Sequence, residues 1–272
     1  MGMMRAMRTP TDITTDLLAL IEHRLVGQRP PRVAAVHLPP VAWTGTKDGE
    51  FGAVELDSGA LGLSYVLLDN TLAALAGNNG QRLVGSDALA LALARLWRNG
   101  LGAERTLGFA AVNALSRHLF DQAGLVPPDA LDSIGGLDPQ PHDHIGMVGF
   151  CPPLVKQVTA CGARLTVVEL RADLAGAHPG FEVTLDSAAL QACNKVLMTS
   201  TVLLNDSLDD LLAHCHQASA VAMIGPGAGC LPQPLFDRGV TALGGTWITD
   251  RTAFVAALRS GVPWGEIGRA HV

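Results

Sequence analysis

The chain has 272 residues, 48% of them hydrophobic and 16% charged, with a formal net charge of −6. This length and apolar content allow a sizeable buried core and predict a globular protein of two domains. The acidic balance, without a cluster of Lys and Arg among aromatic residues, argues against a nucleic-acid partner. The apolar runs are much shorter than the roughly 20 residues of a membrane span, and the N-terminus lacks the apolar middle region of a signal peptide. We therefore expect a cytoplasmic protein with no membrane partner.

The first part of the chain predicts a helix followed by three strands. Threonines and aspartates precede apolar residues at helical spacing in 11–26, which predicts a capped amphipathic helix. Three apolar and β-branched runs follow at 33–38, 51–56 and 61–68, separated by Pro, Gly and Asp turn signals. We expect an antiparallel meander with a hairpin loop at 43–50.

Two helices are expected next. Ser86 is a candidate N-cap for the first, and the second covers 106–120, where small residues form a stripe that lets another element approach closely. Asn113 lies beside that stripe. Residues 1–123 are thus predicted to form an α+β domain, and 124–144, rich in Pro, Gly and Asp, has the composition of a linker.

From residue 145 onward strands and helices alternate regularly, which predicts a parallel sheet covered on both faces. The clearest unit runs from His144 to Glu169, where an apolar run, a Cys-Pro-Pro turn, a helical pattern and a second β-branched run form a strand–helix–strand crossover. Because ligands of such sheets bind beyond the carboxyl ends of the strands, three loops should converge on one site. The predicted strands are 145–149, 165–168, 196–200, 220–224 and 240–243, and the loops are 149–153, 199–206 and 225–230.

A resemblance to a known family rests on four segments: TLGFAAVNAL, GMVGFCPPLV, TSTVLLNDSLDDLL and IGPGAGCLPQPLFDRGV. Together they resemble the bacterial and archaeal family known as "putative heavy-metal chelation" proteins, from about residue 12 to about residue 260. The resemblance implies an α/β fold in which an N-terminal α+β domain similar to that of enolase precedes a Rossmann-like parallel-sheet domain over 145–266. It also implies a ligand site in the cleft between the two domains.

The same resemblance implies a set of ligand-binding residues. Ser200 stands where we expect a glycine, which bears on how closely a ligand can approach the backbone of that loop. Turn and capping chemistry is an alternative role for the hydroxyls of 199–201 and for Asn205. The residues carried over on the matched segments are Asn113, Gly149, Pro153, Thr199, Ser200, Thr201, Asn205, Gly225 and Pro226.

Glu169 leads to an alternative function. It ends the second strand of the crossover, 20 residues after Gly149, where the ribose-binding acids of dinucleotide enzymes lie. The G-x-G-x-x-G pattern is absent, and Phe150 and Pro153 crowd the path of a pyrophosphate, so NAD is disfavoured. The alternative is an enzyme that holds a nucleoside-containing cofactor at Gly149, Phe150 and Glu169. A solvated acid at the strand end is the other role open to Glu169.

The cysteines suggest a transition metal as a cofactor. All five lie in the second half with no C-x-x-C pair, so we expect free thiols. Cys151 begins a helix whose dipole favours the thiolate, and Cys230 also follows a strand, so these two are the candidate metal ligands; apolar packing is their alternative role. Cys161 and Cys215 continue apolar helix stripes and are expected to be buried. The His-Asp-His of 142–144 lies at the amino end of its strand, too far away to share a metal with Cys151.

The leading hypothesis is a protein that binds a small polar or anionic molecule, such as a metal chelator or a metal complex, in the interdomain cleft. Whether it catalyses a reaction is left open. Small-residue helix faces permit a homodimer without requiring one. The final IGRAHV, residues 267–272, matches the translation of a common sequencing adapter, so we expect it not to be native.

Overall fold

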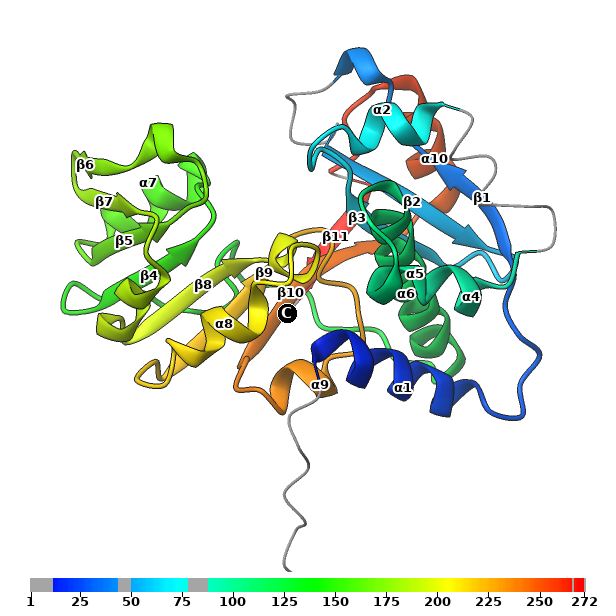
Figure 1. Ribbon diagram of the computed structural model, residues 1–272, viewed down its shortest axis with the longest axis horizontal. Helices are drawn as coiled ribbons and strands as arrows, with labels where there is room; N and C mark the ends of the chain where they lie inside the picture. Colours follow the sequence, from blue (N-terminus) through cyan, green and yellow to red (C-terminus); the bar gives the residue numbers. More distant parts are fainter. Residues whose placement is uncertain (1–11, 44–49, 78–87, 266, 272) are drawn as a thin grey trace, which may run out of the picture.

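The computed structural model describes residues 12–43, 50–77, 88–265 and 267–271. Within the predicted hairpin loop of 43–50, residues 44–49 lie outside the described residues, as does the Ser86 cap. The described part has an N-terminal α+β half followed by a parallel-rich sheet, which confirms the predicted fold class (Figure 1).

The predicted meander is present as a three-stranded antiparallel sheet in the order β1-β2-β3. The helix before it begins at the expected place because Asp12 accepts a hydrogen bond from the backbone N–H of Thr15, 2.8 Å away. The elements of this half are α1 (Ile13–Leu25), β1 (Val33–His37), η1 (Val41–Trp43), β2 (Phe51–Leu56), β3 (Leu61–Tyr65), α2 (Thr71–Ala76), α4 (Ala90–Ala94), α5 (Leu96–Asn99) and α6 (Ala103–Gln122).

α6 lies very close to the sheet, as its stripe of small residues predicted. A Cβ added to Gly62 of β3 would lie 2.0 Å from the backbone nitrogen of Ala114 on α6. Gly108 of α6 is equally close to α5, where a Cβ would lie 2.1 Å from the nitrogen of Trp97. Only glycine fits at these two crossings, so α6 is fixed against the sheet on one side and against α5 on the other.

The large sheet has eight strands in the order β11-β10-β9-β8-β4-β5-β7-β6. The six strands from β10 to β7 are parallel, and β11 and β6 are antiparallel at the two edges. The predicted crossover is present as β4, α7 and β5. The three strands that the sequence did not predict are β6, β7 and β11. The strands are β4 (His144–Val148), β5 (Arg164–Val168), β6 (Gly176–His178), β7 (Phe181–Thr184), β8 (Lys195–Thr199), β9 (Ala220–Ile224), β10 (Ala242–Ile248) and β11 (Gly268–His271).

Both faces of this sheet are covered, because successive residues of its strands enter two different apolar clusters. In β8, for example, Val196 and Met198 pack on one side while Leu197 packs on the other. The helical segments of this half are α7 (Pro152–Ala160), η3 (Ala172–Leu174), η4 (Ser187–Ala192), η5 (Ser200–Leu203), α8 (Leu208–Ala213), α9 (Gln233–Phe236) and α10 (Arg251–Ser260).

Part of the predicted linker also covers the sheet. Ile134 and Leu137 are buried in the cluster beneath α7, and a Cβ on Gly135 would lie 2.9 Å from the Cβ of Ala222 in β9. The segment 134–137 therefore packs as part of the second half, although its composition is that of a loop. The domain boundaries themselves stay predictions.

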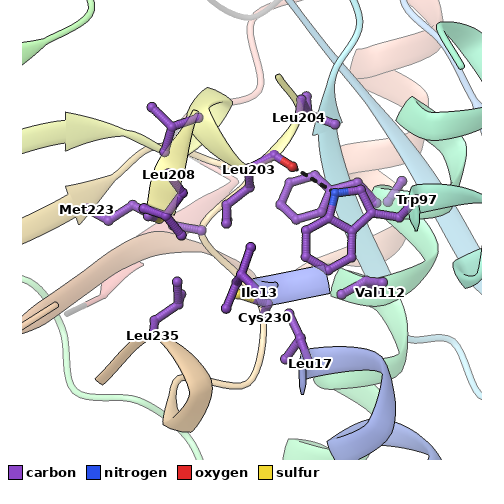
Figure 2. Close-up of a cluster of buried hydrophobic side chains, with 14 of the residues drawn as sticks. Ile13, Leu17, Trp97, Val112, Leu203, Leu204, Leu208, Met223, Cys230 and Leu235 are labelled. Atoms are coloured by element: carbon purple, nitrogen blue, oxygen red, sulfur yellow. Dashed lines mark hydrogen bonds between the residues drawn. The ribbon is translucent and has the colours of Figure 1, made fainter. Parts of the chain in front are cut away.

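The two halves share one apolar core. Ile13 and Leu17 of α1 and Trp97 of α5 pack with Leu203 and Leu208 of the second half (Figure 2). The indole N–H of Trp97 also donates a hydrogen bond to the carbonyl oxygen of Leu203, at 2.7 Å. The boundary between the halves is thus a continuous packed core on this side of the molecule.

The C-terminal residues return to the N-terminal half. Phe254 and Leu258 of α10, together with Trp264, pack with Phe51 and Leu61 of the three-stranded sheet. The rings of Phe51 and Trp264 meet edge to face, with centroids 6.3 Å apart. In the part of the chain that the structure describes, no helix is both long enough and apolar enough to cross a membrane.

Candidate functional site

The three loops that follow β4, β8 and β9 meet at the carboxyl edge of the sheet. Gly149 has φ 91°, and a Cβ there would lie 3.0 Å from the Cγ2 of Thr199. Gly225 has φ 134°, and a Cβ there would lie 2.7 Å from the Oγ of Ser200. We call this meeting point, made by Gly149, Thr199, Ser200 and Gly225, the three-loop junction.

The hydroxyl residues at the junction fill space and form turns. Ser200 is buried, and its Oγ lies between the loop of β8 and the glycines at 225 and 227. The Oγ atoms of Thr199 and Thr201 are hydrogen-bonded to each other at 2.7 Å. The Oδ1 of Asn205 accepts hydrogen bonds from the backbone N–H and the hydroxyl of Ser207, at 3.3 and 2.6 Å. These contacts are the turn chemistry that the sequence left open as the alternative to ligand contact.

Asn113 reaches the junction from α6 of the other half. Its Nδ2 donates to the carbonyl oxygens of Leu63 in β3 and Gly227 in the third loop, at 2.7 and 2.9 Å. Its side chain is 2% exposed, and its Oδ1 has no hydrogen-bond partner among the described residues. Asn113 and Pro226 line a cavity of about 20 Å³, which is room for about one water molecule. Asn113 thus connects the halves and keeps one buried acceptor without a partner among the described residues.

The Glu169 side chain stabilises the first loop through hydrogen bonds to its backbone. Its two carboxylate oxygens accept hydrogen bonds from the backbone N–H groups of Phe150 and Leu170, at 2.7 and 2.8 Å. The ring of Phe150 stacks on Phe181, with centroids 6.1 Å apart, in the cluster beneath α7. Pro153 is exposed in the first turn of α7, where a missing N–H costs no helical hydrogen bond. Both oxygens of Glu169 thus already accept a backbone hydrogen bond, which gives the side chain a structural role in this loop.

The two candidate metal ligands lie in different surroundings. Cys230 is buried in the shared core (Figure 2), and burial raises the pKa of its thiol to about 12. Cys151 is half-buried at the start of α7. Within the described ranges, no group of three or more His, Cys, Asp or Glu side chains is placed to hold a metal ion. The apolar surroundings of Cys230 disfavour the thiolate that a metal requires.

Two further cysteines and the aspartate of the His-Asp-His segment also have defined positions. Cys215 is buried as expected, but the prediction for Cys161 is wrong, because it ends α7 and is exposed. Asp143 is buried at the amino edge of the sheet, where it forms an ion pair with Lys195 at 2.8 Å. Burial raises the pKa of Asp143, but hydrogen bonds from Lys195, the Gln140 backbone and Asn194 outweigh it and bring the pKa to about 2.

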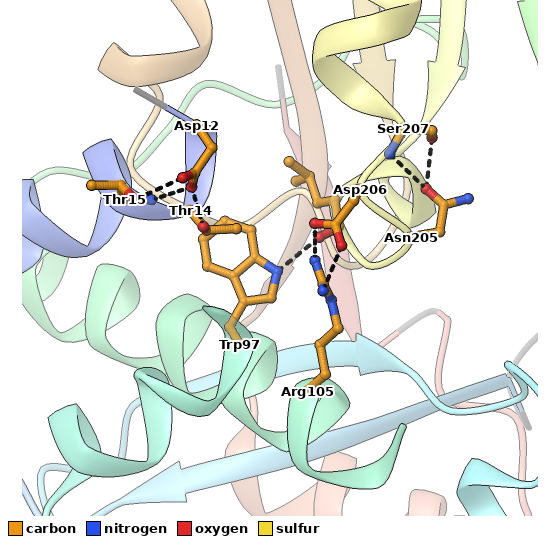
Figure 3. A network of polar contacts seen from close by, with 9 residues as sticks. Asp12, Thr14, Thr15, Trp97, Arg105, Asn205, Asp206 and Ser207 are labelled. Carbon is orange, nitrogen blue, oxygen red and sulfur yellow. Dashed lines mark hydrogen bonds and ion pairs between the residues drawn. The ribbon is translucent and has the colours of Figure 1, made fainter. Parts of the chain in front are cut away.

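A much larger cavity of about 390 Å³ lies between the two halves, and none of the predicted ligand-binding residues lines it. α1, α5 and α6 contribute one wall, and the far end of the second loop with the start of α8 contributes the other (Figure 3). We call it the interdomain cavity. It is lined by Asp12, Ile13, Thr14, Arg98, Arg105, Val202, Leu203, Asp206, Leu208 and Asp209.

An ion pair between Arg105 and Asp206 spans this cavity from one half to the other (Figure 3). Arg105 Nη1 lies 2.7 Å from Asp206 Oδ2, and Nη2 contacts Oδ1. The Nε of Arg105 is buried and has no partner among the described residues. The sequence analysis did not predict this ion pair.

The other charges of the cavity are already held by neighbours. Partial burial raises the pKa of Asp12, but hydrogen bonds from Thr14 and Thr15 and the charge of Arg98 outweigh it, so the pKa falls to about 2. Asp209 pairs with the Nε of Arg238 at 3.2 Å. Beneath these groups lie the buried apolar side chains of Ile13, Val202, Leu203 and Leu208. The cavity thus has a charged rim and an apolar floor.

The chain matches two protein-family models that share one description. The family model DUF364, described as "putative heavy-metal chelation", matches residues 132–270, just over half of the chain. The chain belongs to this family. A second model with the same description, DUF4213, matches residues 50–116. The two matched ranges contain Arg98, Arg105 and Asp206, while Asp12 lies outside both.

Two solved DUF364 structures share the fold across nearly the whole chain. A protein of unknown function from Pyrococcus horikoshii has a TM-score of 0.68 at 19% identity, with 95% of this chain and 98% of that chain covered. One from Desulfitobacterium hafniense DCB-2 has a TM-score of 0.66 at 17% identity, with 94% and 97% covered. At these identities the likeness shows the fold alone. No match was found among curated proteins.

Proposed function

We propose that this DUF364 protein binds a small organic anion, such as a metal chelator or its metal complex, in the interdomain cavity. The observation that carries the proposal is a cavity of about 390 Å³ at the boundary of the two halves, with Arg98 and Arg105 on its rim and an apolar floor. This volume lies within the range of about 300–1,000 Å³ that is common for small-molecule sites.

The chemistry of the rim favours an anion. A guanidinium binds carboxylate and phosphate groups through paired N–H donors, and these are also groups through which organic chelators hold metals. The apolar side chains of Ile13, Val202, Leu203 and Leu208 can contact the hydrocarbon part of such a molecule. The family description supports a metal-bound form of the ligand. The surroundings of Cys230 support a chelator, rather than the thiols of this chain, as the holder of the metal.

The three-loop junction supports the cavity from one side. Thr199 and Ser200 pack against the loops of β4 and β9, and the next turn of the same loop supplies Val202, Leu203 and Asp206 to the cavity wall. We therefore propose that Gly149 and Gly225 act by positioning the second loop, and that Asn113 acts by fixing the third loop against β3. In this proposal the residues of the predicted site support the cavity wall and do not themselves contact the ligand.

Native mass spectrometry and elemental analysis of the purified full chain would test the proposal first. We expect a bound organic anion, with or without a transition metal, at a stoichiometry near one per chain. Titration with picolinate, a chelator with one carboxylate on an aromatic ring, and with its ferric complex then defines the site, since Arg105→Ala should weaken binding by about tenfold or more.

Arg171→Ala is the matched control, because Arg171 also pairs with an aspartate, Asp173, on the surface and lines neither cavity. It should bind as the unsubstituted protein does. Binding that Arg105→Ala leaves unchanged, or a purified chain that takes up neither probe, would overturn the proposal.

A further inference from the structure

We infer that the carboxylate of Asp206 occupies, in the ligand-free interdomain cavity, the place on Arg105 that the carboxylate or phosphate group of the ligand takes when it binds. This inference rests on the proposed function and adds the chemical group that the site recognises. It also gives the ion pair between the two halves a role in binding, as an internal competitor of the ligand.

Arg105 has the properties of a preformed anion site. Its side chain is 14% exposed and starts from the first turn of α6, which Gly62 and Gly108 fix against the sheet and α5. Both of its terminal nitrogens point at one carboxylate, which is the fork geometry that arginine uses for carboxylates and phosphates. Its Nε–H has no partner among the described residues, so the present arrangement does not use all of its donors.

The side chain of Asp206 can move away from Arg105. Its side chain is 67% exposed, and its backbone has φ 57°, a left-handed conformation that most residues avoid. Within the described part of the chain, Arg105 is the partner of its carboxylate and no other side chain or backbone N–H holds it. Moving Asp206 outward would therefore break this one ion pair, and the anionic group of the ligand would replace the carboxylate, so the largely buried Arg105 is not left without a partner.

The other two carboxylates of the rim are held more firmly. Asp12 accepts hydrogen bonds from Thr14 and from the backbone and side chain of Thr15, and Asp209 pairs with Arg238. Their negative charges remain in place when a ligand enters. They disfavour a second anionic group at that side of the cavity, whereas the apolar floor accepts a hydrocarbon group. The ligand class is thus a molecule with one exposed carboxylate or phosphate group and an apolar or cationic remainder.

Calorimetric titration of the full chain at low ionic strength with benzoate and with phenyl phosphate, which share the ring and differ in the anionic group, would test this inference. The decisive variants are Asp206→Asn, which removes the charge, and Asp206→Gly, which removes the side chain and tolerates the left-handed backbone. Each should bind at least one probe about tenfold more tightly than the unsubstituted protein. A preference for benzoate identifies a carboxylate as the natural group, and a preference for phenyl phosphate identifies a phosphate.

Asp209→Asn is the matched control, because it removes one negative charge from the same rim without freeing Arg105. Its effect should stay within about threefold. Arg105→Lys should lose most of the binding in either background, because lysine cannot form the two-nitrogen fork. Thermal unfolding of each variant confirms that the fold is intact.

The outcomes separate the two proposals. Equal gains for Asp206→Asn and Asp209→Asn would show a general charge effect and overturn the inference, while the proposed function would stand if Arg105 is still required. Binding that is independent of Arg105, or no binding of either probe to any variant, would overturn both.

Discussion

Trp97 on α5 donates its indole N–H to the carbonyl oxygen of Leu203, 2.7 Å away, and both side chains are buried in the core that the two halves share. Leu203 lines the interdomain cavity, so this hydrogen bond connects the N-terminal half directly to the cavity wall. The second loop is therefore held from two directions, by Trp97 on one side and by the three-loop junction on the other.

Replacing Trp97 with Phe should destabilise the protein and loosen that wall. The change leaves the carbonyl of Leu203 without its buried donor, which costs about 1–3 kcal/mol. Urea unfolding measures the loss of stability, and amide hydrogen exchange should become faster at 202–204 while β4 keeps its protection. Unchanged exchange at 202–204 would contradict this role for Trp97.

Replacing Gly225 with Ala tests the packing of the three-loop junction. The added Cβ meets the Oγ of Ser200 at 2.7 Å and also imposes a side chain on a backbone with φ 134°. Gly176 is the matched control, because it has φ 130° with nothing within 4 Å of an added Cβ. Gly176→Ala should cost about 1–2 kcal/mol from the backbone alone. Gly225→Ala should cost at least about 1 kcal/mol more.

The contact with Ser200 can be isolated by a double substitution. Ser200→Ala removes the Oγ, so it should recover most of the extra cost in the Gly225→Ala background. Chemical denaturation of the two single variants, the double variant and the unsubstituted protein gives the coupling energy directly. A coupling near zero would mean that Ser200 does not fill the space between the two loops.

The fold was predictable because its elements have strong local patterns. The alternation of apolar runs and helical segments after residue 145 predicted β4, β5, β8 and β9 close to their observed ends. β6 and β7 were missed because they are short and carry a polar, partly exposed sequence, AHPGFEVT, without a long apolar run. The packing of Ile134 and Leu137 could not be read from a segment whose Pro and Gly content is that of a loop.

The candidate site was less predictable, because its key contacts join residues far apart in the chain. Arg105 and Asp206 are 101 positions apart, and neither stands in a motif that marks an ion pair. The parallel topology did predict that the three loops meet, and they do so at Gly149, Thr199 and Gly225. A periodic sequence pattern does not show whether the three loops leave a cavity where they meet, because that depends on the volumes of their side chains.

Replacing Glu169 with Ala separates the present proposal from an enzyme with a nucleoside-containing cofactor. Because Glu169 accepts hydrogen bonds from the N–H groups of Phe150 and Leu170, we expect a loss of about 1.5–3 kcal/mol in stability. Affinity for the probes of the interdomain cavity should change by less than about threefold, since Glu169 does not line it. A nucleoside that copurifies with the unsubstituted chain and is lost from Glu169→Ala would instead support the cofactor enzyme.

A buried histidine should make the stability of the N-terminal half depend on pH. His37 of β1 is 2% exposed, and its Nε2 lies 2.7 Å from Glu55 of β2, which also pairs with Arg251 of α10. Burial is the main cause that lowers the pKa of His37 below its usual value. The hydrogen bond to Glu55 opposes this shift without reversing it, and the charges of Arg259 and Arg251 lower the pKa further. For Glu55, burial raises the pKa, but hydrogen bonds from His37 and Arg251 outweigh it and the net direction is downward.

Both pKa shifts predict that the folded protein becomes less stable as the pH falls. The unfolded chain takes up a proton on histidine near pH 6.5, whereas the folded chain takes it up only at lower pH, so stability is fully present above about pH 6.5 and falls as the pH drops below it. The carboxylate adds a further loss below about pH 4.5. Urea unfolding between pH 8 and 5 should therefore show a falling free energy, with a slope of at most about 1.4 kcal/mol per pH unit from this one histidine. His37→Gln should reduce that slope, and the remainder comes from His118 and His144, because burial also lowers the pKa of these two side chains. His142→Gln, which changes a side chain that is 82% exposed, should keep the full slope. An equal slope in the two variants would mean that another group controls the acid sensitivity.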